Sequence, residues 1–204
     1  MSIREQSTMT PETILDSLKA GNARFVAGAL EARDAKDQVA RGADGQAPIA
    51  IVLACIDSRV APEVVFDHGL GELFCVRVAG NVLNDDVLGS MEFACLVSTA
   101  KLIVVMGHSS CGAIRGACEG AQHEHLTGLL QKMQPAIDAV AATGQQPGAE
   151  FIQQVAEQNA RDVVRQIRTS SRSLASALDQ RKIGIVDAMY SVESGHAVFG
   201  DLLA

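Results

Sequence analysis

The sequence predicts an α/β fold: a mainly parallel sheet of about four to five strands, flanked by helices and preceded by an N-terminal helical arm. Short continuous apolar runs, typical of strands buried on both faces, alternate along the chain with longer segments of helical period. The 204 residues are 48% hydrophobic and show no compositional break. Residues 1–204 are therefore expected to form a single domain.

The N-terminal arm is predicted from a helix start signal. Thr10 is a good capping residue, and the proline that follows it is favoured at the first helical position. Apolar side chains then recur at roughly helical spacing as far as Val26, with a break expected near Gly21. Residues 29–46 are charged, alanine-rich and short of large apolar side chains, so we expect them to be partly helical and to lie on the surface.

Four apolar runs predict the strands of the sheet, at residues 49–54, 73–78, 102–106 and 183–186. The last run leads into a hairpin-like segment that ends with residues 197–199. Helical patterns fill the intervals, at about residues 86–100, 122–142 and 150–178. The third pattern is long enough for two helices. Strands and helices that alternate in this way are typical of a parallel sheet.

Charge and composition exclude some partners and favour a reducing compartment. The formal net charge of -7 argues against nucleic acid, because neutralising phosphates requires a basic face. The polar first ten residues and the absence of a long apolar run predict a cytoplasmic protein that does not enter a membrane. The five cysteines are an odd number and widely spaced, which favours reduced thiols over a disulfide framework.

Two loops carry the residues of chemical interest, and each directly follows a predicted strand. The first contains Cys55, Asp57 and Arg59, and the second contains His108 and Cys111. Because ligands bind beyond the carboxyl ends of parallel strands, neighbouring strands would bring both loops to one edge of the sheet. We therefore expect one shared site.

Cys55, His108 and Cys111 form the ligand set expected of a catalytic zinc site. Such a site has three protein ligands and keeps one position open for water. The H-x-x-C spacing of His108 and Cys111 lets both side chains reach one ion from a turn that enters a helix, and the start of a helix favours the thiolate form of Cys111. Gly107 and Gly112 allow the tight backbone of this turn.

Asp57 lies beside this metal set and has two possible roles. Cys55, Asp57 and Arg59 alternate along the chain, so in an extended conformation they point to the same side. The carboxylate either binds zinc as a fourth ligand and closes the site, or is held away by a bidentate ion pair with Arg59. In the second case the open position of the zinc is left to water, and Asp57 stays ionised and can accept a hydrogen bond from a zinc-bound hydroxide.

Both loops closely resemble those of the β-class carbonic anhydrases. The resemblance rests on C-x-D-S-R-V at residues 55–60 and G-H-S-S-C-G-A at residues 107–113, and it continues through P-E-x-x-F-D and E-L-F-C-V-R-V-A-G-N at residues 62–67 and 72–81. It implies one zinc per chain, held by the two cysteines and the histidine, with Asp57 and Arg59 as the catalytic dyad. The implied reaction is the reversible hydration of carbon dioxide to bicarbonate and a proton, by attack of zinc-bound hydroxide.

The same resemblance implies a substrate pocket and an oligomer. Gln46 is expected to hydrogen-bond the substrate, Phe74 to wall a narrow apolar pocket, and Phe93 to replace an aromatic residue that carries a hydroxyl in the family. Gly112 is also assigned to substrate binding. Some walls of the pocket are expected from the other subunit of a homodimer or a dimer of dimers. Val52 stands where the bicarbonate-inhibited branch has a tryptophan, so we expect the uninhibited branch.

Other interpretations of these residues are less favoured. A structural zinc site would have four closed protein ligands, and a thiol hydrolase with Cys111 as nucleophile would use neither Cys55 nor the dyad. Zinc hydrolases of carbonyl sulfide or carbon disulfide resemble the same family, and access to the pocket would distinguish them. Outside the two loops, Cys75 and Cys95 are expected in the core, and Cys118 is expected to bind no zinc. The histidines are expected in solvated, surface or packing positions, with a further role in proton movement for the first of them; they are His68, His123, His125 and His196.

Overall fold

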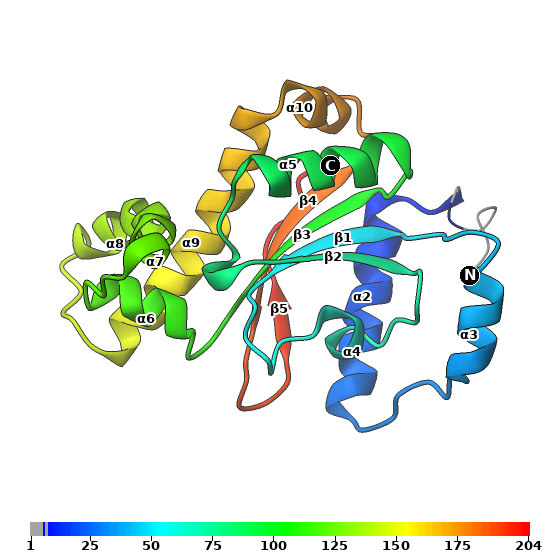
Figure 1. The fold of residues 1–204 in the computed structure, drawn as a ribbon, viewed down its shortest axis with the longest axis horizontal. Helices are drawn as coiled ribbons and strands as arrows, with labels where there is room; N and C mark the ends of the chain where they lie inside the picture. Colours follow the sequence, from blue (N-terminus) through cyan, green and yellow to red (C-terminus); the bar gives the residue numbers. More distant parts are fainter. Residues whose placement is uncertain (1–5, 7) are drawn as a thin grey trace.

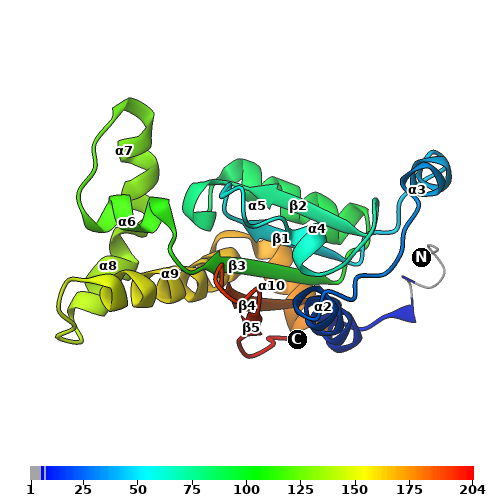
Figure 2. The ribbon, with the colours of Figure 1, turned by 90° about the horizontal axis from the view of Figure 1, so that it is seen from below.

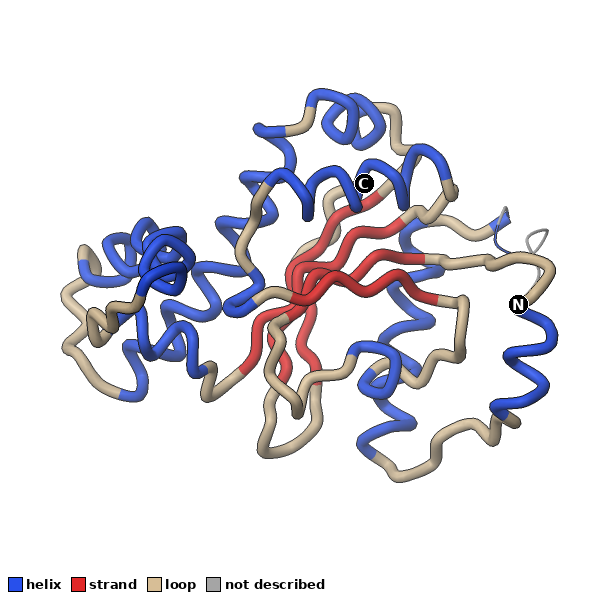
Figure 3. The backbone as a smooth tube through the Cα atoms, in the orientation of Figure 1, coloured by secondary structure: helices blue, strands red, loops and turns tan. Residues whose placement is uncertain are grey.

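The computed structural model describes residues 6 and 8–204, and its centre is a five-stranded sheet in the order β2-β1-β3-β4-β5 (Figures 1 and 3). Strands β1 to β4 are mutually parallel, and β5 is antiparallel to β4. The predicted α/β class is therefore confirmed. The strands are β1 (Ala50–Ala54), β2 (Leu73–Arg77), β3 (Leu102–His108), β4 (Gly184–Tyr190) and β5 (Ala197–Phe199).

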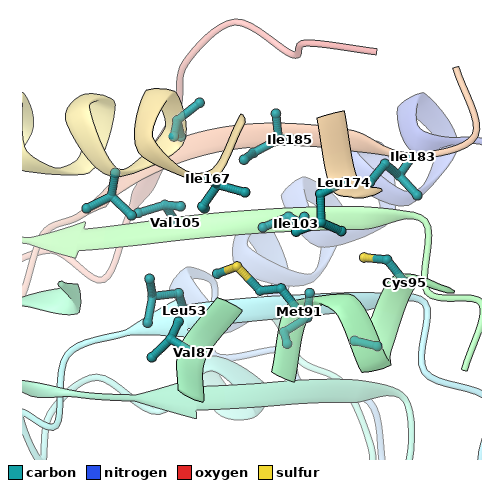
Figure 4. Close-up of a cluster of buried hydrophobic side chains, with 14 of the residues drawn as sticks. Leu53, Val87, Met91, Cys95, Ile103, Val105, Ile167, Leu174, Ile183 and Ile185 are labelled. Carbon is teal, nitrogen blue, oxygen red and sulfur yellow. The ribbon is translucent and has the colours of Figure 1, made fainter. Parts of the chain in front are cut away.

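Helices cover both faces of this sheet. One face packs against α5 (Asp85–Glu92), the π-helical turn η2 (Phe93–Val97), α9 (Ala149–Ser170) and α10 (Arg172–Asp179), and the other packs against α2 (Pro11–Val26) and α4 (Pro62–Val65). Figure 4 shows the first of these cores, where Leu53, Ile103 and Ile185 from three strands meet side chains of α5, α9 and α10. Side chains of β1, β3 and β4 alternate between the two cores, as expected of central strands.

The remaining helices lie beyond the ends of the strands. Figure 2 shows α6 (Gly112–Cys118), α7 (Glu124–Leu130) and α8 (Gln134–Ala141) grouped on the side where β3 ends, and α3 (Ala35–Gly42) on the opposite side. Short 3-10 turns, η1 (Ala79–Asn81) and η3 (Gln131–Met133), complete the described elements. Among the described helices, none combines the length and apolar character needed to cross a membrane.

The arm helix α2 begins as predicted but does not break at Gly21. The Thr10 side chain accepts a hydrogen bond from the backbone N–H of Thr13, and the Thr13 hydroxyl accepts one from Thr10 N–H in return. A Cβ atom at Gly21 would lie 1.8 Å from the carbonyl oxygen of Phe66. The glycine therefore permits close packing of α2 against the end of α4, and the expectation of a break there is wrong.

Two predicted helical stretches also differ in detail. Residues 122–142 form α7, η3 and α8 in place of one helix, because Pro135 sits in the first turn of α8 and cannot continue a preceding helix. The stretch 86–100 ends in the π-helical turn of η2. The longest stretch divides into α9 and α10, where Ser171 ends the first helix and caps the second with its hydroxyl. The two helices expected there are confirmed.

Candidate metal centre

The three predicted metal ligands meet at the carboxyl ends of β1 and β3. Cys55 follows β1 directly, His108 is the last residue of β3, and Cys111 is the residue before α6. Because β1 and β3 are paired neighbours, with Ala54 opposite Met106, their exits lie side by side. The ligand atoms of the three residues all lie within 4.8 Å of one another, and all three residues are buried. No other metal-binding group of this kind occurs in residues 6 and 8–204.

The donor set fits a zinc ion. Nδ1 of His108 lies 2.9 Å from the carbonyl oxygen of Ser109, which fixes the ring and directs the other nitrogen, Nε2, toward the sulfurs. That Nε2 is buried and has no hydrogen-bond partner among the described residues. The sulfur atoms of Cys55 and Cys111 are 4.0 Å apart. Two zinc–sulfur bonds of about 2.3 Å at a tetrahedral angle span nearly this distance.

A hydrogen bond links the thiols of Cys55 and Cys111 and shifts their pKa values in opposite directions. The hydrogen bond from Cys111 lowers the pKa of Cys55, and His108 and the Gly80 N–H, 3.3 Å from the Cys55 sulfur, act in the same direction. The same thiol–thiol hydrogen bond, together with burial, raises the pKa of Cys111. A divalent cation between the sulfurs would favour the thiolate form of both.

Asp57 and Arg59 form a bidentate ion pair beside the ligands. Nε of Arg59 donates to Oδ1 of Asp57 at 2.9 Å, and Nη2 donates to Oδ2 at 2.7 Å. The Arg59 backbone N–H also donates to Oδ1 at 3.0 Å. These bonds hold the pKa of Asp57 well below its usual range. In this structure the carboxylate therefore faces the guanidinium, the second of the two arrangements considered for Asp57.

Arg77 and Glu193 stabilise the loops of the site and escaped the sequence analysis. Arg77, at the end of β2, donates from Nε to the Cys55 carbonyl at 2.9 Å and from Nη2 to the Asp57 carbonyl at 2.6 Å. Glu193 accepts hydrogen bonds from the hydroxyls of Ser109 and Ser110, at 2.7 and 3.2 Å. The only local signal for Arg77 was its place in the segment at residues 72–81 that carries the family resemblance.

The predicted substrate-pocket residues are not all brought to the metal ligands within one chain. Gly112 begins α6 next to Cys111. Gln46, by contrast, precedes β1, so the whole strand separates it from Cys55. It is exposed and lines a hollow of about 560 Å³ with residues around α3 and Gly71.

Phe74, in β2, and Phe93, the first residue of η2, are also remote from the metal ligands. Phe74 is opposite Ile51, at the beginning of β1 and not at its end. Its ring meets that of Phe93 edge to face, with centroids 6.3 Å apart. Both rings line a surface hollow of about 590 Å³ between β2 and α5. One chain alone therefore presents the metal ligands and the dyad at one place and these two aromatic rings at another.

The other cysteines and histidines lie outside the metal centre. All five cysteines are free, and burial raises the pKa of Cys95 to about 12, as expected of a core thiol. His68 is half-buried, with Nδ1 2.6 Å from the Phe66 carbonyl, and burial lowers its pKa. His123 and His125 are exposed at the start of α7.

Comparison with known proteins agrees with this geometry. A family model described as carbonic anhydrase matches residues 50–197. The chain is 34% identical over 197 residues to "Carbonic anhydrase 2" of Mycobacterium tuberculosis, covering 94% of this chain and 93% of that protein. It is 35% identical over 187 residues to a carbonic anhydrase of Mycolicibacterium smegmatis, covering 91% of each.

Solved structures of β-carbonic anhydrases have a similar fold. A tetrameric enzyme from Sordaria macrospora superposes with a TM-score of 0.77 at 20% identity, covering 95% of this chain and 100% of that one. The enzyme CafA of Aspergillus fumigatus gives a TM-score of 0.75 at 22% identity, covering 93% and 90% of the two chains. These similarities extend over the sheet and its flanking helices.

Proposed function

Because the chain belongs to the carbonic anhydrase family and has the fold of its β class, we propose that it catalyses the reversible hydration of carbon dioxide to bicarbonate. The observation that carries this proposal is the buried group of Cys55, His108 and Cys111 beside an ionised carboxylate. A zinc ion held by these three residues would supply a Lewis acid that lowers the pKa of water. Asp57, Arg59 and the surrounding loops are proposed to orient the attacking water and to leave space for carbon dioxide.

Asp57 and Arg59 are proposed to orient the attacking water. The bidentate ion pair keeps Asp57 ionised and turned toward Arg59, so that its carboxylate can accept a hydrogen bond from that water while the cation site stays open. Arg77 holds the backbone of the same loop at two carbonyl groups, which fixes the position of the carboxylate relative to Cys55. Gly112 lies beside Cys111 without a side chain to obstruct the approach of carbon dioxide.

We further propose that a second copy of the chain completes the substrate pocket. Gln46, Phe74 and Phe93 lie away from their own chain's metal ligands, and Phe93 is 51% exposed. Leu96 and Val97, in the same turn η2 as Phe93, are also exposed. A homodimer, or a dimer of such dimers, would cover this apolar surface. A cytoplasmic location is proposed on the strength of the five free thiols.

The proposal is tested by a carbon dioxide hydration assay combined with metal analysis. The purified protein is expected to bind about one zinc per chain and to hydrate carbon dioxide, and chelation should remove both properties together. Carbonyl sulfide and carbon disulfide, offered in parallel, should be poorer substrates. Stoichiometric zinc without hydration would indicate a structural site, and hydrolysis that survives metal removal but not alkylation of Cys111 would indicate a thiol hydrolase.

A further inference from the structure

A buried amide on α9 is linked to the metal ligand Cys55 through a single intervening residue, Gly80. Asn159 is only 2% exposed, and it occurs on a helix face whose other buried residues are mostly apolar, among them Ala156, Ala160 and Val163. Its Nδ2 donates a hydrogen bond of 2.9 Å to the carbonyl oxygen of Gly80, from a position 79 residues away in the sequence. Burying an amide is costly unless it is hydrogen-bonded, so this contact fixes both partners.

Gly80 in turn contacts a metal ligand. Its backbone N–H donates to the sulfur of Cys55 at 3.3 Å. The residue has φ 66° and ψ 19°, a left-handed conformation that favours glycine, and a Cβ atom there would lie 2.1 Å from Cε of Met133. The conformation of Gly80 therefore decides whether its N–H points at the sulfur, and the Asn159 amide holds the carbonyl of the same residue.

We propose that Asn159 is a positioning residue of the metal centre, which holds Gly80 so that its N–H remains hydrogen-bonded to the Cys55 thiolate. The proposal rests on the assignment of Cys55 as a zinc ligand. A hydrogen bond to a thiolate draws charge from the sulfur and restricts its position, as partners of ligands do in other metal sites. Helix α9, which covers one face of the sheet, thereby also influences the position and charge of the Cys55 sulfur at the end of β1.

The direct test uses wild-type protein loaded with a spin-active cadmium isotope. If the N–H of Gly80 is hydrogen-bonded to a metal-bound sulfur, its amide resonance should show scalar coupling to cadmium across the hydrogen bond. In Asn159→Leu, which keeps a similar volume but has no donor for the Gly80 carbonyl, the coupling should weaken or vanish. Absence of coupling in the wild type, or unchanged coupling in the variant, would overturn the proposal.

A second test measures the metal itself. In Asn159→Leu, zinc affinity in a chelator competition should fall about 10- to 100-fold, the range typical of lost partners of metal ligands. With cobalt(II) in the site, the sulfur-to-metal charge-transfer band should move to longer wavelength, because a thiolate that lacks its hydrogen bond donates charge more readily. An unchanged band and affinity in this variant would contradict the positioning role.

Asn22→Leu is the matched control. Asn22 is also buried, and its Nδ2 donates to the carbonyls of Val65 and Gly195, at 3.1 and 2.9 Å, on the opposite side of the sheet. This variant should lose stability while keeping the zinc affinity and cobalt spectrum of the wild type. Equal losses in both variants would show a general effect of destabilisation. All of these measurements report on the bound metal and not on catalysis. They therefore test the role of Asn159 even if the protein fails to hydrate carbon dioxide.

Discussion

Two aspartates that follow β1 form ion pairs with arginine, and the structure gives them different surroundings. Asp57 is paired with Arg59, two residues away, and the Arg59 side chain is 51% exposed. The side chain of Asp67 is 2% exposed and is paired with Arg24 and Arg33, which come from the end of α2 and the segment before α3. The first pair faces the metal ligands, whereas the second joins parts of the chain that are distant in sequence.

This comparison shows that a depressed carboxyl pKa does not by itself identify a catalytic group. Arg59 holds the pKa of Asp57 low through its hydrogen bonds. Burial alone would raise the pKa of Asp67, but the hydrogen bonds of Arg24 and Arg33 outweigh it and the pKa is lowered. Both carboxylates are thus ionised at neutral pH. Only the position of Asp57 beside Cys55 and His108 indicates a chemical role, so substitutions at the two pairs should have separable effects.

Loss of a metal ligand should have the largest effect on activity. Cys55→Ser, His108→Ala and Cys111→Ser each remove one of three protein ligands, so the variants should contain well under one zinc per chain and should hydrate carbon dioxide at the uncatalysed rate. Metal analysis and stopped-flow hydration assays measure both properties. Full zinc retention by these variants would show that the metal is held elsewhere.

Arg59→Ala should reduce activity strongly while keeping zinc. Without the guanidinium, the Asp57 carboxylate is free to turn toward the cation and occupy its open position, and hydration should fall by roughly 10²-fold, the scale of other losses around metal ligands. Zinc content should stay near one per chain. The cobalt(II) spectrum should change to that of a site with an added oxygen ligand.

The double variant Asp57→Ala/Arg59→Ala separates this explanation from simple loss of the arginine. Removing the carboxylate should reopen the metal position and restore part of the rate. Full activity in Arg59→Ala with zinc bound would mean that the ion pair does not control access to the metal.

Asp67→Asn should have the opposite effects, with stability lost and the chemistry kept. The substitution removes the buried carboxylate that lies between Arg24 and Arg33, and among the described residues it leaves both arginines only the more exposed Glu31 as an acidic partner. Breaking a fully buried ion pair costs about 3–5 kcal/mol, and because these arginines are partly exposed we expect roughly 2–3 kcal/mol. Urea unfolding with saturating zinc measures this change. The hydration rate per folded, zinc-loaded chain should match the wild type; a fall like that of Arg59→Ala would remove the distinction between the two pairs.

The two pairs also show what could be predicted from the sequence. Asp57 and Arg59 stand two residues apart beside a cysteine, so a local motif was enough to predict their contact. Asp67 contacts Arg24 and Arg33 only because α2 packs against α4. A periodic pattern of apolar residues in the sequence does not predict such contacts between distant segments. The same reason explains why Asn159 was missed, and why Gly21 was mistaken for a helix break when it marks close packing.

Prediction of the fold was best where burial alone decides the structure. Continuous apolar runs located the four parallel strands to within a few residues, and three of these, β1, β3 and β4, are central strands buried on both faces. The run at 102–106 was too short, since β3 continues through Gly107 and His108, which pair with Met189 and Tyr190 of β4. Polar or small residues at a strand end are held by pairing with a neighbour, which the sequence of one strand does not reveal.

The smallest expected effect is a difference in how stability depends on pH. A carboxyl group whose pKa is lowered by folding stabilises the folded state above its unfolded pKa, near 3.9 for aspartate, and loses this contribution as the pH falls toward the folded pKa. The wild type should therefore exceed Asp67→Asn in unfolding free energy by a constant amount from about pH 7 to 5. Below about pH 4 that difference should shrink, because protonation of Asp67 removes the charge that the substitution also removes. Urea titrations of both proteins across this range measure the difference directly, and other carboxylates cancel in the comparison. A difference that stays constant down to pH 3 would mean that Asp67 contributes through its packing and neutral hydrogen bonds, and that its charge is not what joins α2 to α4.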